Sequence, residues 1–251
     1  MSELAQLPLA FWIVAPLTIL FAYTVFGMSG FGSTIIALPI LANWLPLTYL
    51  VPLMALGDII AATTVGGSNR RHVSRAELKR LLPFMLLGIA LGVTVLVNVP
   101  QHPLKIGLAL FAMGVGLYSI LNPSPKSTIS PWWCIPAGSV AGALAAVFGA
   151  GGPVNVAYLA GRLRDKDEIR STISVIIFVS ATLRTGLYAI AGLVFKAATL
   201  AGFAMAAPFA WAGIALGSRI HTSLSNEQMR RVIGGVLMAS GAVLLSRTLP
   251  G

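Results

Sequence analysis

Long apolar runs separated by short polar loops dominate the pattern of this chain. The runs cover residues 9–28, 47–66, 81–99 and 104–121 in the first half and 132–148, 171–195, 197–217 and 231–247 in the second. A helix needs about 20 predominantly apolar residues to cross a bilayer, so these runs predict an all-α integral membrane protein. Before the third run, the sequence from Ser74 to Glu77 fits a capping box, which predicts that these two residues cap a helix start.

A glycine-rich break follows the first apolar run of each half. The first break lies in residues 27–39 (G-M-S-G-F-G-S-T-I-I-A-L-P) and the second in residues 149–158 (G-A-G-G-P-V-N-V-A-Y). Irregular backbone at membrane depth is tolerated only where protein or a water-filled cavity satisfies its polar groups. Paired breaks in corresponding positions of two halves point to the binding site of a transporter. The second break lacks the Gly-Lys-Ser/Thr of a nucleotide-binding loop.

Short matches between the two halves indicate an internal repeat. The sequence G-I-A-L-G occurs at residues 88–92 and again, 125 positions later, at residues 213–217. The two breaks align at an offset of 119, which places Gly30 on Gly149. We therefore predict a first membrane repeat at 1–121, a polar linker at 122–131 and a second membrane repeat at 132–251. The alternative is chance similarity, because small residues are common where membrane helices pack.

Composition supports the membrane class and argues against several others. Of the 251 residues, 57% are hydrophobic and 10% are charged, against about 25% charged in soluble domains. The net charge of +10 would suggest nucleic acid in a soluble chain, but here the basic residues lie in loops, where they set topology and contact anionic lipid. The single Cys134 excludes an internal disulfide, and the three histidines lie apart in loops. We expect no metal, no cofactor and no nucleic-acid partner.

The Arg and Lys residues outside the spans decide between two topologies. If each broken segment crosses the membrane once, these residues split 8 to 8 between the two sides. If each break is the tip of a hairpin that returns to its starting side, 13 lie on one side and 3 on the other. The positive-inside rule favours the second arrangement.

This charge distribution predicts two inverted-topology repeats. Each repeat consists of a glycine-broken re-entrant helical hairpin and three transmembrane helices, which gives roughly eight to ten membrane segments in all. Both termini are then periplasmic, and the cytoplasmic loops are 67–80, 122–131, 162–170 and 218–230.

Two ionisable residues fall near the middle of a span. They are Asp58 and Arg184, and an offset of 126 relates them across the two halves. Either residue costs about 2.5–3.5 kcal/mol at a helix centre on insertion scales, and such residues usually face a bundle interior or a cavity. Arg184 is therefore a candidate ligand for an anionic substrate, and Asp58 is a candidate counter-charge or proton carrier. The alternative is a buried Asp58–Arg184 pair that touches no substrate.

Short polar side chains and glycines surround both breaks. A helix that begins after a glycine turn directs unpaired N–H groups and the positive end of its dipole at the turn, which suits an oxyanion. The alternative is that these small residues only allow close helix packing. The candidate substrate-binding residues are Gly30, Gly32, Ser33, Thr34, Gly149, Gly151, Gly152, Asn155 and Arg184.

The two breaks resemble those of the TauE/SafE family of sulfite and organosulfonate exporters. The resemblance rests on the glycine cluster, the apolar run and Pro39 in the first half, repeated over residues 149–159, and it extends over nearly the whole chain. It implies a bacterial inner-membrane permease for small anions, often sulfur oxyanions or sulfonates. The chain departs from the pattern at Ser33, where a third glycine is common, and at Tyr158, which replaces the proline of the first copy.

The function that follows is a secondary transporter that moves a small anion, a sulfur oxyanion or an organosulfonate, by alternating access. Two alternatives remain open: a passive anion channel, and a permease for a carboxylate or another non-sulfur anion. An intramembrane enzyme is disfavoured, because no paired carboxylates or His/Cys/Ser grouping lie at membrane depth.

Overall fold

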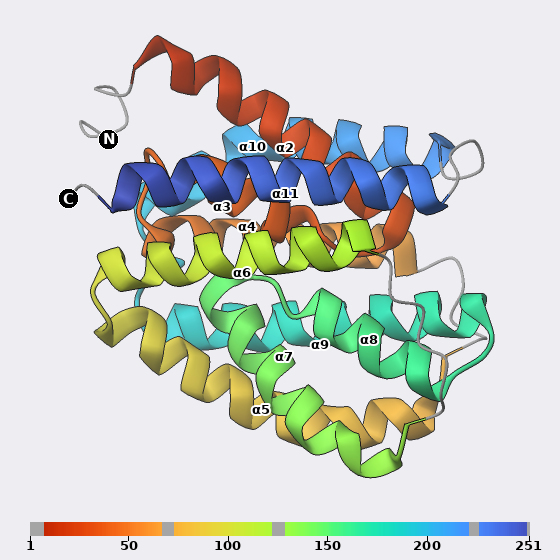
Figure 1. Cartoon of the computed structure of the whole chain (residues 1–251). Coiled ribbons are helices and arrows are strands. Elements are labelled where there is room, and N and C mark those ends of the chain that lie inside the picture. The colour runs from red at the N-terminus through yellow and green to blue at the C-terminus, as the bar shows by residue number, and fades with distance from the viewer. Residues whose placement is uncertain (1–7, 67–72, 122–128, 221–225, 250–251) are drawn as a thin grey trace.

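The computed structural model describes residues 8–66, 73–121, 129–220 and 226–249 (Figure 1). These residues form ten α-helices and one short 3₁₀-helix, η2, and no strand. The helices are α2 (Leu9–Ser29), α3 (Ser33–Leu41), α4 (Leu47–Gly66), α5 (Arg75–Asn98), α6 (Gln101–Leu121), η2 (Pro131–Trp133), α7 (Cys134–Phe148), α8 (Gly152–Arg162), α9 (Lys166–Ile190), α10 (Ala197–Ile220) and α11 (Asn226–Thr248).

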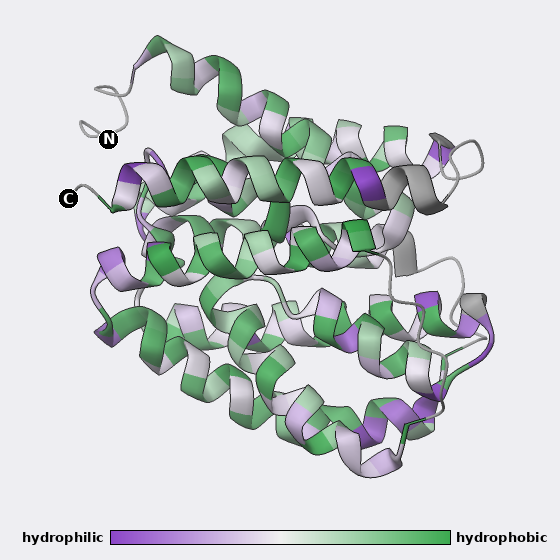
Figure 2. Ribbon diagram, in the orientation of Figure 1, coloured by the Kyte–Doolittle hydropathy of each residue, from purple (hydrophilic) through white to green (hydrophobic). Residues whose placement is uncertain are grey.

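The helices have the length and surface of a membrane protein. Seven segments among the described residues are long and apolar enough to cross a bilayer, and they lie in α2, α4, α5, α6, η2 with α7, α9 and α10. Large apolar side chains point outward along them, as Leu87 and Leu91 do on α5 with exposures of 62% and 66%. Figure 2 shows mostly hydrophobic ribbon between hydrophilic helix ends. An outer surface of this kind is stable in lipid, because hydrocarbon does not penalise it as water would.

The two short helices turn back beside their longer neighbours. Near the start of α2, the ring of Phe11 lies 6.0 Å, centroid to centroid, from that of Trp44, which follows α3. The amide of Ile129, before α7, donates to the carbonyl of Gly161, near the end of α8, over 2.9 Å. Each pair, α2 with α3 and α7 with α8, is therefore a helical hairpin. Figure 1 shows the open ends of the two hairpins at opposite ends of the bundle.

The repeated G-I-A-L-G sequence packs each half against the hairpin of the other half. On α5, a Cβ at Gly88 would clash with the Ser139 carbonyl of α7, and one at Gly92 would lie 2.7 Å from the Ala143 carbonyl. On α10, a Cβ at Gly213 would lie 2.5 Å from the Leu20 carbonyl of α2. Small residues let membrane helices approach this closely. The matching sequences thus make matching helix contacts, α5 with α7 and α10 with α2.

Several sequence predictions differ from the structure or lie outside its described part. The break in the first half begins only after Ser29, so Gly27 lies inside α2. The capping box is wrong: Ser74 makes no side-chain cap bond, and the Glu77 side chain binds other residues, described below. Residues 67–72, 122–128 and 221–225, which belong to predicted cytoplasmic loops or the linker, lie outside the described residues, as do 1–7 and 250–251 at the termini.

Candidate functional site

The backbone of each break requires glycine. Gly30, Gly32 and Gly149 have φ values of 81°, 101° and 62°, in the left-handed region that L side chains rarely adopt. Gly30 and Gly149 end α2 and α7, and each donates its amide to a carbonyl of the preceding turn. The chain then reverses, and the next helix begins at Ser33 in the first hairpin and at Gly152 in the second.

The two breaks touch each other inside the bundle. A Cβ at Gly149 would clash with the side chain of Thr34, at the start of α3. A Cβ at Gly152 would lie 2.8 Å from the ring of Phe31, in the first break. The glycines of the second break therefore allow the first break to approach, and the beginnings of α3 and α8 come together.

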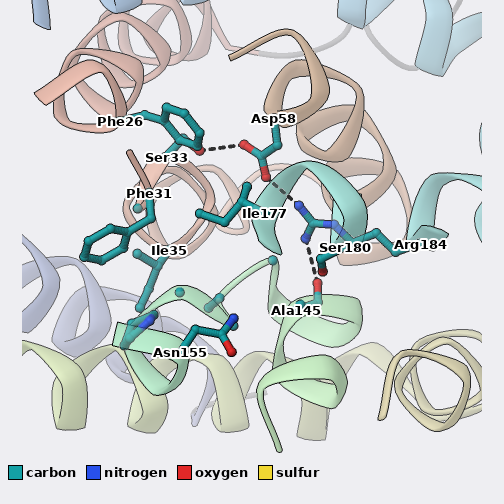
Figure 3. A pocket seen from close by; sticks show the side chains of 16 residues that line it. Phe26, Phe31, Ser33, Ile35, Asp58, Ala145, Asn155, Ile177, Ser180 and Arg184 are labelled. Atoms are coloured by element: carbon teal, nitrogen blue, oxygen red, sulfur yellow. Dashed lines mark hydrogen bonds and ion pairs between the residues drawn. The ribbon is translucent and has the colours of Figure 1, made fainter. Parts of the chain in front are cut away.

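A small cavity of about 30 Å³ lies between the two breaks (Figure 3). Its wall also includes side chains from α4 and α9, so the cavity is formed by both halves of the chain. Eight of the ten predicted site residues line it: Gly32, Ser33, Asp58, Gly149, Gly151, Gly152, Asn155 and Arg184. The volume has room for about one or two water molecules.

Asp58, on α4, is the buried anion of this cavity. The residue is 3% exposed. Ser33 donates its hydroxyl to Oδ1 over 2.6 Å, and Thr34 donates to Oδ2 over 2.9 Å. A longer bond of 3.4 Å comes from the hydroxyl of Tyr23, on α2. The start of α3 is thus attached to α4 by the two side chains that follow the first break.

Arg184, on α9, is the buried cation beside it, also 3% exposed. Its Nη2 lies 2.5 Å from Asp58 Oδ2, and its Nη1 donates to the carbonyl of Ala145 over 2.7 Å (Figure 3). One turn further along α9, Tyr188 donates its hydroxyl to the carbonyl of Ala146 over 2.5 Å. Arg184 therefore joins α4 of the first half to α7 of the second half.

Two polar atoms at the cavity have no hydrogen-bond partner among the described residues. They are Nε of Arg184, a donor, and Oδ1 of Asn155, an acceptor on α8. Asn155 is 3% exposed. Buried polar atoms are satisfied in most proteins, so these two atoms are available to a bound molecule.

The remaining candidates lie next to the cavity, and the sequence reasoning missed several residues. Thr34 binds Asp58 without lining the cavity, and Gly30 packs near Ser174. Ser29, the last residue of α2, has its hydroxyl within 2.8 Å of the carbonyls of both Val25 and Phe31, where it can donate to either and so stabilises the turn. The missed residues are Tyr23 at Asp58 and the lining residues Phe26, Phe31, Ile35, Ala145, Ala150, Pro153, Ile177 and Ser180. Four of them, Phe31, Ile35, Ala150 and Pro153, lie within the two predicted breaks but are apolar, so the search for polar and glycine ligands passed over them. The others stand in ordinary apolar or small-residue sequence, which carries no signal of their position.

A second buried carboxylate lies at the end of the bundle where α5 begins and α8 ends. Glu77 is 3% exposed. It accepts a 2.5 Å bond from the hydroxyl of Tyr158 and lies 2.9 Å from Arg162 and 2.7 Å from Arg80. Arg162 also donates to the carbonyl of Ile129 over 3.0 Å. We call these four side chains, Glu77, Arg80, Tyr158 and Arg162, the end cluster. They attach the second hairpin to α5.

The cavity offers charge and hydrogen bonds rather than metal ligation. The described residues contain no group of three or more His, Cys, Asp or Glu side chains that could hold a metal ion. What converges on the cavity is a guanidinium, a carboxylate, hydroxyls and the starts of two helices. Helix starts and guanidinium groups are the usual partners of oxyanions.

Two helix breaks that meet at a buried, charged cavity in a bundle of membrane-length helices are the features of a membrane transporter. The chain belongs to the sulfite exporter TauE/SafE family, whose model matches residues 15–244. It is 31% identical over 193 residues to the "Probable inner membrane transporter protein TsaS" of Comamonas testosteroni, covering 76% of this chain and 81% of that protein. No solved structure gives a significant match to the chain.

Proposed function

We propose that the protein is a secondary transporter that moves a small anion, a sulfur oxyanion or an organosulfonate, across the bacterial inner membrane. The observation that supports this most is that both glycine breaks and Arg184 line one cavity. The starts of α3 and α8 add unpaired N–H groups and positive dipole ends to the charge of Arg184. The sulfur chemistry is supported by the family's description, and the inner-membrane location by that of the relative.

Alternating access follows from the arrangement of the two hairpins. The cavity of about 30 Å³ has room for one or two water molecules and is too small for a sulfonate group. Binding of the anion therefore needs the two hairpins to move apart. The two halves pack on each other in equivalent ways: α5 of the first half contacts α7 of the second, and α10 of the second half contacts α2 of the first. We propose that the halves are inverted repeats and that rocking of one against the other exposes the anion to each side in turn.

The proposed orientation places the basic segments 67–80, 162–170 and 218–230, which combine loops with the adjoining helix ends, in the cytoplasm and both termini in the periplasm. Figure 1 shows the described helix ends next to these loops at one end of the bundle, opposite the ends of α2 and α11 that adjoin the termini. The positive-inside rule then assigns the loop end to the cytoplasm.

The test is transport by the purified protein in liposomes. Vesicles loaded with unlabelled sulfite or thiosulfate should take up labelled thiosulfate by counterflow, and sulfite, taurine and sulfoacetate should compete better than carboxylates. Preference for a carboxylate would contradict the substrate class and leave the transporter mechanism standing. Flux at channel-like rates, without counterflow, would instead indicate a passive anion channel.

A further inference from the structure

Arg184 is already neutralised by its own partner in the site. Its Nη2 holds Asp58 and its Nη1 holds the Ala145 carbonyl. Among the described residues that line the cavity, Asp58 and Arg184 are the only charged ones. The proposed anion site therefore has no net side-chain charge, and a carboxylate already holds the guanidinium edge that an oxyanion needs.

We propose, resting on the function proposed above, that the protein carries a proton together with each anion and that Asp58 is the proton site. When the anion enters, the Asp58 carboxylate takes up a proton and becomes a neutral carboxylic acid. Arg184 then moves an Nη2–H bond from Asp58 to the anion. The site holds zero net charge before binding and zero net charge with one monovalent anion and one proton bound. On release both leave, and the Asp58–Arg184 ion pair forms again.

The partners of Asp58 suit both of its protonation states. Apart from Arg184, every group that binds it is a hydroxyl: Ser33, Thr34 and Tyr23. A hydroxyl can donate to a carboxylate, and after rotation it can accept from a carboxylic acid. Backbone N–H groups can only donate, so they would leave the O–H of the carboxylic acid without an acceptor. The hydroxyl shell therefore avoids a buried unsatisfied group at either stage, which would otherwise oppose the exchange.

Other ionisable groups around α4 lie away from Asp58. The α9 helix contributes Arg184 and, one turn on, Tyr188, which is engaged with Ala146. The α2 and α3 helices contribute the hydroxyls named above. The ionisable residues of α5, α6, α7 and α10, which also pack against α4, lie within two turns of a helix end. The charge of the cavity is thus decided by the protonation of Asp58 alone.

The first experiment uses the unmodified protein in liposomes that contain a trapped pH indicator. The probes are methanesulfonate and ethanesulfonate, monovalent anions whose charge does not change across the neutral pH range. We expect inward flow of either anion to acidify the lumen, and an imposed pH gradient, acid outside, to drive the anion above its external concentration. Because each anion binds together with one proton, apparent affinity should fall as the pH rises, by up to about tenfold per pH unit.

The second experiment assigns the proton to Asp58. In Asp58→Asn the site has no carboxylate to take up the proton, so we expect proton flow to disappear and the affinity for methanesulfonate, measured by binding, to lose its pH dependence. Glu77→Gln is the matched control, because it also neutralises a 3% exposed carboxylate paired with an arginine; its ratio of protons to anions should equal that of the unmodified protein. If Asp58→Asn does not fold, the gradient experiment on the unmodified protein decides the proposal.

The outcomes separate this inference from the function on which it rests. Anion transport without proton flow, indifferent to a pH gradient, overturns proton coupling and leaves the anion transporter intact. Proton flow that persists in Asp58→Asn overturns the assignment to Asp58. Absence of transport or binding for every anion tested overturns the proposed function, and the inference with it.

Discussion

The central ion pair, Asp58 with Arg184, and the end cluster around Glu77 make an instructive comparison. Asp58 and Glu77 are both 3% exposed, and each is bound by an arginine and a tyrosine. The similarity ends at the cations. Arg184 has a side-chain exposure of 3% and is the single cation at Asp58, whereas Arg162 and Arg80, at Glu77, have exposures of 20% and 44%.

The difference in the exposure of the arginines indicates a binding role for the central ion pair and a structural role for the end cluster. In a low dielectric, two buried charges interact strongly, so neutralising one of them or adding a third charge greatly alters the energy of the other. A binding site for an anion needs this sensitivity. In the end cluster, water reaches the arginines and screens them, so the pairs contribute attachment with little sensitivity to one added charge. The central ion pair is therefore suited to exchange partners with a substrate, and the end cluster is suited to hold the second hairpin on α5.

The largest effect is expected from Arg184→Ala. Anion uptake should fall to background, and the free energy of unfolding should drop by about 3–5 kcal/mol because Asp58 loses its buried partner. The double variant Asp58→Asn/Arg184→Gln should recover most of that stability without recovering transport. Thermal unfolding in detergent and uptake in liposomes measure the two quantities. Wild-type flux in Arg184→Ala would refute its role in binding the anion.

A large loss of transport is also expected from Gly149→Ala. Alanine at this position would have to adopt a positive φ, which costs about 1 kcal/mol. Its methyl group would also push the Thr34 side chain away from Asp58. We expect uptake to fall by about tenfold or more. Gly186→Ala is the control, because it lies on α9 between Arg184 and Tyr188 and its Cβ would meet nothing within 4 Å. Equal activity of the two variants would show that contact between the breaks is dispensable.

A moderate effect is expected from Glu77→Gln, which weakens the attachment of α8 to α5. Stability should fall by about 1–3 kcal/mol, since charged hydrogen bonds to Tyr158 and Arg162 become neutral or are lost. Cys134, the single cysteine of the chain, is 7% exposed at the start of α7, the first helix of the second hairpin. Its reaction with a maleimide should become several-fold faster. Unchanged labelling with unchanged stability would mean that the end cluster does not hold the hairpin.

The smallest effects compare the two tyrosines. Tyr158→Phe removes a 2.5 Å bond to Glu77 and should cost about 1–2 kcal/mol of stability. Tyr23→Phe removes a hydroxyl at 3.4 Å from Asp58 and 3.3 Å from the Met54 carbonyl, and should cost about 0.5 kcal/mol. Thermal unfolding of both variants under one condition measures the difference. A larger loss of stability in Tyr23→Phe than in Tyr158→Phe would show that the hydrogen-bond lengths do not predict the contributions of the two hydroxyls.

Much of the molecule was determined by sequence alone. Hydrophobic run length depends only on the thickness of the bilayer, so it predicted membrane helices without knowledge of their packing. Glycines are placed where a chain reversal needs positive φ, so the breaks at Gly30 and Gly149 were visible. Insertion cost made Asp58 and Arg184 conspicuous, because a charge at the centre of a span is rarely accidental.

Only the tertiary structure decided which of these groups meet and what their charges become. Position in a span gives depth along a helix, but the partner depends on how each helix is rotated and which neighbour it packs against. Glu77 is the clearest case: its spacing from Ser74 suggested a local cap, yet its partners Tyr158 and Arg162 lie 81 and 85 residues away. For Arg184 the sequence left open a free cation or an ion pair. The packing of α4 against α9 places Asp58 on Arg184, because two buried charges that come within reach are far more stable together than apart.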